Sequence, residues 1–373
     1  MRVDLPPPSP DELAHSERVA ALIRGEIYAA GGALDFARYM ELALYAPGLG
    51  YYSAGAAKFG AAGDFVTAPE LGFVFARCLA RAIAPTLRET RGDVLELGPG
   101  SGALAAELLV ELERLDALPV RYLLLERSAD LRERQRTTLT QRCAHLFDRC
   151  VWLDMPPAES WRGALIANEV VDALPVRAFV LRDGEVFARA VGVDGNGRFV
   201  WREIPADAAL QADTAHFVPD ESALPHPFMS EYCPTLVQWL AEVTRNLEHG
   251  AAWFIDYGYS RPEYYAPQHA NGTLRCHFRH RAHDDPLILP GLQDITAHVD
   301  FDALVEAGSA AGFEASVERQ SQFLIRHGLD EVFTDTYASA AGEAARYALA
   351  QEVKRLTLPG QMGDAFRVAM IRR

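Results

Sequence analysis

The stretch of sequence that most constrains the fold is GDVLELGPGSGAL, residues 92–104. An apolar run over 94–97 stops at a glycine-rich turn, and an alanine- and leucine-rich segment follows it. The turn reads Gly98, Pro99, Gly100, Ser101, Gly102. Glycines here allow a tight turn and let backbone amides approach a ligand without an intervening Cβ. The stretch therefore predicts a strand, a turn and a helix at the entrance to a nucleotide-binding site.

Strand-like and helix-like segments alternate after this point. Short apolar runs occur at 94–97, 122–125, 151–153 and 164–167, with helical patterns between the earlier ones. Such alternation is typical of a mostly parallel sheet covered by helices on both faces, and it predicts an α/β fold.

The domain organisation that we predict has two parts. Residues 1–90 read as a helical and loop extension that contributes to the ligand site, and residues 91–373 as the core. Two insertions interrupt the core, at about 178–230 and 261–298. The first alternates with period two around the turn signals Asp183-Gly184 and Gly195-Asn196-Gly197, which predicts antiparallel hairpins.

Several further elements are expected from periodicity and capping residues. The polar, proline-rich residues 1–13 read as a disordered lead-in, and Ser16 as the cap of a helix over 16–30. Asp35 is expected to cap a helix over 36–45. Later helices are expected at about 231–248 and 301–312, and strands within 313–325 and 365–373, with Ser230 and Glu231 at the start of the former helix.

Composition excludes several classes of function. The formal net charge is −15, and an acidic surface repels phosphate backbones, so nucleic acid is not expected as a partner. No apolar run approaches the ~20 residues needed to span a bilayer, so membrane insertion is not expected. The five cysteines are scattered, which favours reduced thiols and a cytoplasmic location. A homodimer is compatible with the sequence, which does not determine the oligomeric state.

The spacing of the glycines is compatible with two ligands. Gly98, Gly100 and Ala103 match the GxGxx(G/A) pattern of NAD sites, whereas Gly98, Gly100 and Gly102 match the GxGxG pattern of S-adenosylmethionine (SAM) sites. The first ligand implies hydride transfer and the second implies methyl transfer.

Acidic residues near the strand ends favour SAM. A carboxylate at Glu96 can orient the amino group of SAM, whereas in an NAD site it would repel the pyrophosphate. Glu126 can accept the ribose hydroxyls of either ligand. Asn168 and Glu169 end the fourth strand, where a methyltransferase faces the transferred methyl group, and Asp172 lies nearby. Two structural alternatives remain open: Glu96 as an ion-pair partner, and Asn168 as the cap of a following helix.

Eight motifs occur in an order that resembles one protein family. They are ALYAPGLGYYSAG, GDFVTAPE, LELGPGSGAL, LLERSADLRERQ, ANEVVDALPV, FIDYG, GTLRCHFRH and GLQDITAHVDF. Over about residues 15–330 the chain is similar to the family of the mitochondrial complex I assembly factor 7 and its bacterial relatives, also called the MidA family. The resemblance implies a class I SAM-dependent methyltransferase fold, Rossmann-like, with an N-terminal helical extension.

The resemblance also implies roles for individual residues. Gly98, Gly100 and Gly102 would line the methionine part of SAM, Glu126 would hold the ribose, and Asn168 and Glu169 would face the methyl group. From the N-terminal side, the cofactor would be covered by Gly63, Asp64, Phe65 and Thr67. The mitochondrial members methylate an arginine of a complex I subunit, so the implied partner is a protein substrate of that kind.

Arginine methylation gives one acidic residue a specific task. A guanidinium stays protonated at neutral pH, and a carboxylate can pair with two of its nitrogens and take up charge as a proton leaves. We assign that task to Glu169, with Asp172 or Asp256 as second candidates. Two rival functions remain: an assembly chaperone that binds SAM without turnover, and a methyltransferase of small molecules.

Two other clusters are less informative. CHFRHRAH brings Cys276, His277, His280 and His283 close together, but its neighbouring arginines oppose a cation, so no metal is expected. IDYGYSRPEYY supplies four tyrosines, Tyr257, Tyr259, Tyr264 and Tyr265. They are expected either to pack at a strand end or to form a wall of the acceptor pocket.

Overall fold

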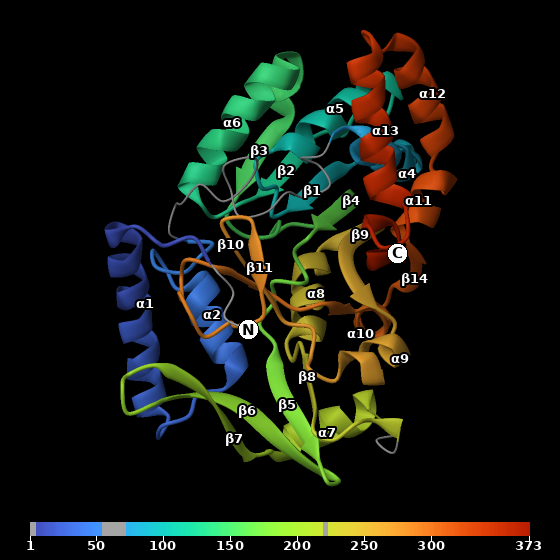
Figure 1. Ribbon diagram of the computed structural model, residues 1–373. Helices are drawn as coiled ribbons and strands as arrows, with labels where there is room; N and C mark the ends of the chain where they lie inside the picture. The colour runs from blue at the N-terminus through green and yellow to red at the C-terminus, as the bar shows by residue number, and fades with distance from the viewer. Residues whose placement is uncertain (1–4, 54–71, 219–222) are drawn as a thin grey trace.

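The computed structural model describes residues 5–53, 72–218 and 223–373. Its centre is a sheet in the order β14-β15-β9-β4-β1-β2-β3 (Figure 1), with a short strand, β13 (Val299–Asp300), beside β9. The strands of the main path are β1 (Asp93–Leu97), β2 (Tyr122–Leu125), β3 (Cys150–Leu153), β4 (Trp161–Asn168), β9 (Leu247–Tyr259), β14 (Glu314–Arg319) and β15 (Phe366–Arg372). Only β15 runs antiparallel to its neighbours on this path. The mostly parallel α/β sheet predicted from the sequence is therefore confirmed.

The strand order places a ligand crevice next to β1. The chain runs from β1 outward through β2 to β3, and then returns to β4 on the other side of β1. Ligands of open α/β sheets bind at such a reversal, beyond the carboxyl ends of the strands. The glycine turn after β1 and Asn168 at the end of β4 both lie at this edge.

Both faces of the sheet are covered. Along β1, Val94 packs into one core, whereas Leu95 and Leu97 pack into the other, as alternation in a strand requires. The first core is shared with α4 (Val74–Thr90), α5 (Ala103–Arg114) and α6 (Ala129–Cys143), and the second with α8 (Leu236–Thr244) and α10 (Phe301–Ala310). Four C-terminal helices add to the first face: α11 (Gln320–Arg326), α12 (Leu329–Ser339), α13 (Glu343–Thr357) and α14 (Met362–Ala365).

The first helix begins earlier than expected. Helix α1 spans Pro10–Ala29, and Ser9 and Glu12 form a capping box at its start, so the expectation of disorder up to residue 13 is wrong for this segment. Ser16 is buried within the helix, and its hydroxyl donates to the carbonyl of Pro290 at 3.0 Å. Helix α2 (Phe36–Tyr45) has the predicted bounds, and Asp35 caps it as predicted.

The segment after β4 forms a separate four-stranded antiparallel sheet, ordered β7-β6-β5-β8. Its strands are β5 (Arg177–Arg182), β6 (Glu185–Val193), β7 (Phe199–Pro205) and β8 (Phe228–Tyr232), and α7 (Ala208–Phe217) lies between the last two. The two predicted hairpin turns are confirmed. This sheet packs against α2, where the rings of Phe36 and Trp201 have centroids 4.8 Å apart.

Two expectations for the later chain are corrected. Residues 231–248 do not form one helix: Ser230 and Glu231 lie in strand β8, α8 follows, and β9 begins at Leu247. The strand expected within 313–325 covers only the first half of this range: β14 ends at Arg319, and helix α11 follows it. A third sheet joins β10 (Arg275–Phe278), β11 (Arg281–His283) and β12 (Asp294–Thr296), and α9 (Arg261–Tyr264) precedes it. Within the described ranges, every helix is too short or too polar to cross a membrane.

Candidate active site at the carboxyl ends of the strands

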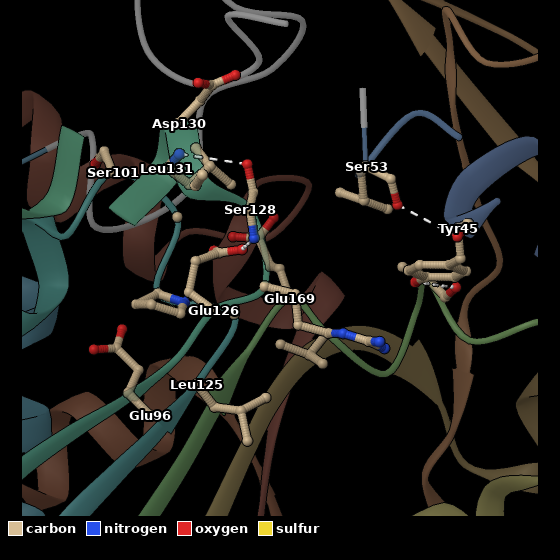
Figure 2. A pocket seen from close by; sticks show the side chains of 18 of the residues that line it. Tyr45, Ser53, Glu96, Ser101, Leu125, Glu126, Ser128, Asp130, Leu131 and Glu169 are labelled. Carbon is tan, nitrogen blue, oxygen red and sulfur yellow. Dashed lines mark hydrogen bonds between the residues drawn. The ribbon is translucent and has the colours of Figure 1, made fainter. Parts of the chain in front are cut away.

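A cavity of about 700 Å³ lies beyond the carboxyl ends of β1, β2 and β4. Its lining comes from the end of α2 and the loop after it, the glycine turn, the end of β2 with the start of α6, and the loop after β4. Figure 2 shows Glu96, Glu126 and Ser128 on one side of the cavity and Tyr45 and Ser53 on the other, with Glu169 between them.

The glycine turn uses the conformational freedom of its glycines. Gly98, Gly100 and Gly102 have φ angles of 59°, 52° and 81°, in the left-handed region that strains other residues. Gly98, Pro99 and Gly100 line the cavity, as expected. Gly102 lies at the start of α5 instead, where an added Cβ would come 3.2 Å from the Cα of Gln135.

Glu96 is buried at the end of β1 and lines the cavity. Its Oε2 accepts a hydrogen bond from the hydroxyl of Tyr122 at 2.7 Å, and burial raises its pKa to about 7. The described part of the chain gives Glu96 no ion-pair partner, so the structural alternative for this residue has no support there. A buried carboxylate with a neutral partner is suited to pair with a cationic group of a ligand.

Glu126 lies just beyond β2, on the same side of the cavity. Its Oε1 accepts from the backbone N–H of Ser128 at 2.8 Å, and its Oε2 accepts from the amide of Gln135 at 3.3 Å. Burial raises the pKa of this carboxyl. The two bonds fix the direction in which the carboxylate faces the cavity.

Gln135 is a supporting residue that the sequence reasoning missed. Its amide donates to the carbonyl of Gly100 at 2.9 Å, and its Oε1 accepts from the indole N–H of Trp152 at 2.8 Å. It thereby joins the glycine turn, Glu126 and β3. One feature of the sequence could have identified it. Gln135 lies one helical turn before Leu139 on the buried face of α6, and a polar residue is unusual on that face.

Asn168 and Glu169 follow β4 and line the cavity together. Glu169 has a φ of 53°, and its backbone N–H donates to the carbonyl of Ile255 at 2.9 Å. The amide nitrogen of Asn168 lies 3.4 Å from Oε1 of Glu169. Turns rather than a helix follow these residues, which excludes the alternative that Asn168 caps a helix.

Asp172 and Asp256 do not line the cavity. Oδ2 of Asp256 accepts from the backbone N–H groups of Val171 and Asp172, at 3.0 and 3.1 Å. Burial raises the pKa of Asp172 to about 6, and burial together with the nearby Asp172 raises that of Asp256. The position of Asp256 indicates a supporting role, because it holds the backbone of the loop that follows Glu169.

The opposite wall comes from the end of α2 and the loop after it. The hydroxyl of Tyr45 donates to the carbonyl of Ala173 at 2.9 Å, and that of Tyr52 donates to Oδ1 of Asp294 at 2.8 Å. Their rings stack, with centroids 5.5 Å apart and an angle of 22° between the planes. The sequence alone does not mark either tyrosine as a site residue.

The other residues of interest lie elsewhere. Tyr257, Tyr259, Tyr264 and Tyr265 are absent from the cavity lining, so they pack at a strand end rather than forming its wall. Cys276 and His283 face each other across the β10–β11 hairpin, and the described residues contain no group of three or more acidic, histidine or cysteine side chains placed to hold a metal. The residues expected to cover the cofactor, Gly63, Asp64, Phe65 and Thr67, lie outside the described residues.

The donor set fits SAM. Glu96 can pair with a cationic amino group, Glu126 can accept ribose hydroxyls, and the glycine turn offers backbone amides at the start of a helix. Oδ1 of Asn168 is buried and has no hydrogen-bond partner among residues 5–53, 72–218 and 223–373. A buried acceptor without a partner is costly, which points to a donor supplied by a ligand.

Comparisons with known proteins agree with this geometry. A model of the family of S-adenosyl-L-methionine-dependent methyltransferases matches residues 78–318. The mitochondrial protein arginine methyltransferase NDUFAF7 of Rattus norvegicus is 27% identical over 390 residues, which cover 96% of this chain and 86% of the relative. For the Homo sapiens protein of the same name the identity is 27% over 368 residues, with 90% and 79% covered.

A solved structure extends the similarity to the whole fold. A COG1565 superfamily protein of Burkholderia thailandensis, crystallised with S-adenosyl-homocysteine bound, is 42% identical and superimposes with a TM-score of 0.93. The match covers 99% of this chain and 95% of that one. The choice of SAM over NAD and the class I methyltransferase fold are thereby confirmed. The chain belongs to the family of S-adenosyl-L-methionine-dependent methyltransferases, and its cofactor is SAM.

Proposed function

We propose that this protein transfers a methyl group from SAM to an arginine side chain of a protein. The observation that carries the proposal is the carboxylate of Glu169 on the cavity wall, held in a left-handed backbone conformation after β4. Strain of this kind is retained where the surrounding structure enforces it, and it is common at functional sites. The names of the mitochondrial relatives support arginine as the acceptor.

The charge of the cavity suits a cationic acceptor. Among the described residues, four acidic side chains line it and one arginine opposes them: Glu96, Glu126, Asp130, Glu169 and Arg127. The whole chain carries a formal charge of −15. Such a site attracts a guanidinium and disfavours an anionic substrate.

The protein itself has to position the acceptor and remove a proton from it. When bound, SAM supplies a methyl group already activated by its sulfonium. Glu169 would pair with two guanidinium nitrogens, orient the third, and accept the proton that the guanidinium releases as the methyl group is transferred to it. Asn168 would add a polar contact beside it, and Asp256 would hold the loop in place. Most of the rate gain would come from alignment of the acceptor.

A labelling experiment tests the proposal. The purified protein is incubated with methyl-labelled SAM and a lysate from a strain that lacks it, and the label is located by mass spectrometry. We expect label on arginine of one or few proteins, and none with the Glu169→Gln variant. The resemblance makes a complex I subunit the first protein to examine.

Other results would reject the proposal in distinct ways. Label confined to small molecules would support a small-molecule methyltransferase. An unlabelled lysate, with SAM binding shown separately, would support the assembly chaperone without turnover.

A further inference from the structure

The cavity has a wall that cofactor binding does not explain. The residues that fit SAM come from the glycine turn, the end of β2 and the end of β4, whereas Tyr45 is the last residue of α2 and Tyr52 lies in the loop after it. Tyr45 lies across the cavity from Glu96 and Glu126 (Figure 2), and Tyr52, which also lines the cavity, stacks on it. This places them on the side left for the methyl acceptor.

The hydroxyls of both tyrosines are committed to internal hydrogen bonds. Tyr45 donates to the carbonyl of Ala173, and Tyr52 donates to the buried carboxylate of Asp294. Burial raises the pKa of both phenols, so both stay neutral at physiological pH. The wall therefore offers a ligand its ring surfaces rather than its hydroxyls.

The two rings lie nearly parallel, one stacked against the other, in a fixed orientation. Their planes differ by 22°, and Tyr45 is 37% exposed although its hydroxyl is hydrogen-bonded. The bond from Tyr45 to Ala173 also ties this wall to the loop that begins at Glu169. Aromatic surface and carboxylate are thus held in one relative position.

This pair of groups matches the two properties of a guanidinium. Its flat face stacks on aromatic rings, and its edge donates parallel hydrogen bonds to a carboxylate. An ammonium carries the same charge but has no plane to stack. Building on the proposed arginine methylation, we propose that the Tyr45–Tyr52 stack is the acceptor wall of the cavity and selects a guanidinium over an ammonium.

The test measures binding rather than turnover. The protein, saturated with S-adenosyl-homocysteine, is titrated with N-acetyl-arginine amide and separately with N-acetyl-lysine amide, and probe signals are followed by NMR. We expect the wild type to prefer the arginine probe. Tyr45→Leu should weaken arginine-probe binding about tenfold and remove the preference, whereas Tyr45→Phe, which keeps the ring, should retain the preference.

Two controls keep the test interpretable. Tyr347→Leu removes a tyrosine that is 68% exposed on α13, and it should change neither probe affinity. Affinity for S-adenosyl-homocysteine reports whether each variant is folded, and it should stay within about threefold of the wild type. Equal binding of the two probes by the wild type, or a preference that survives Tyr45→Leu, overturns the proposal. So does a selective loss of S-adenosyl-homocysteine, which would place the wall against the cofactor.

The two proposals can fail separately. Label on a residue other than arginine, with the probe preference intact, rejects the proposed function and leaves a guanidinium-binding wall. Labelled arginine without any probe preference rejects the wall alone.

Discussion

Glu169 combines backbone strain with a position on the cavity wall. A non-glycine residue at φ 53° costs about 1 to 2 kcal/mol, and the bond from its N–H to Ile255 helps to hold it there. The carboxylate is thereby directed at the cavity before any substrate arrives, which lowers the cost of ordering it during the reaction.

Replacing this carboxylate by an amide should separate binding from chemistry. Glu169→Gln keeps the size of the side chain but removes the charge that pairs with the guanidinium, so we expect kcat to fall at least ~100-fold. Affinity for SAM, measured by calorimetry, should change by no more than a few-fold. Turnover equal to that of the wild type would assign the task to another residue.

Glu96 should make cofactor binding depend on pH. Its pKa of about 7 means that the carboxylate is mostly neutral below pH 7 and charged above it. Only the charged form pairs with the amino group of SAM, so affinity should rise with pH up to about 7 and then level off. The Glu96→Gln variant should bind more weakly and show no such rise in a titration between pH 5.5 and 8.5.

The same group affects stability in the opposite direction. In the cofactor-free protein the pKa is raised from its ordinary value of 4.5, so the folded state holds the proton more tightly than the unfolded state. The contribution of Glu96 to the free energy of unfolding is therefore full below pH 4.5 and lost as the pH rises through 7, a change of about 3 kcal/mol. Urea denaturation at a series of pH values measures the free energy of unfolding of the wild type and of Glu96→Gln. Between pH 4.5 and 7 this free energy should fall more steeply with pH in the wild type than in the variant.

The cavity-lining residues that the sequence predicted lie at the ends of parallel strands. Glu96, Glu126, Asn168 and Glu169 all reach the cavity, because a position at the end of a parallel strand determines where a side chain lies. Gln135 and Tyr45 were missed because their partners are far along the chain: Gly100 is 35 residues from the first, and Ala173 is 128 residues from the second. No local pattern records such a contact.

At the scale of elements, α6 acts on the glycine turn through one side chain. Gln135→Leu would leave the carbonyl of Gly100 and the indole N–H of Trp152 without their partner in a buried region. Each lost hydrogen bond costs about 1 to 3 kcal/mol, and the loss of the bond to Gly100 would make the glycine turn less ordered. We expect the Kd for SAM to rise about tenfold or more.

A matched variant identifies the bond that matters. Trp152→Phe removes only the indole donor and leaves both bonds from the Gln135 amide in place. Its Kd for SAM should stay close to that of the wild type in the same calorimetric assay. Equal losses in both variants would show that α6 acts by packing alone.

Errors in the predicted elements have a common physical origin. Long periodic segments and glycine-marked hairpins were predicted well, as α2 and the turns at 183–184 and 195–197 show. The helix predicted over about 231–248 wrongly includes Glu231 and Tyr232 at the end of β8, because the pairing of this strand with β5, rather than local preference, determines its conformation. Tertiary contacts of this kind are invisible in a single sequence.

At the scale of the whole molecule, charge should influence how the acceptor is captured. A protein with a formal charge of −15 and an acidic cavity attracts a cationic partner over distances that salt screens. Raising the salt concentration from 50 to 300 mM should therefore increase the KM for the acceptor protein several-fold.

The affinity for the cofactor serves as the control for this salt experiment. Glu96, which fits the amino group of SAM, is buried, and a buried charge pair is screened less, so the Kd for SAM should change by less than about twofold over the same range. An acceptor KM that is insensitive to salt would mean that the surface charge has no part in recognition.

The position of β15 has a consequence for synthesis of the chain. This strand comes last in the sequence, yet it lies between β9 and β14 and pairs with both. As the chain leaves the ribosome from its N-terminus, β9 and β14 emerge first, and their facing edges have no neighbour until residues 366–372 follow. The sheet therefore closes only after residues 366–372 have been synthesised, and until then the nascent protein presents two open strand edges that a chaperone can bind and that a second nascent chain can pair with by mistake.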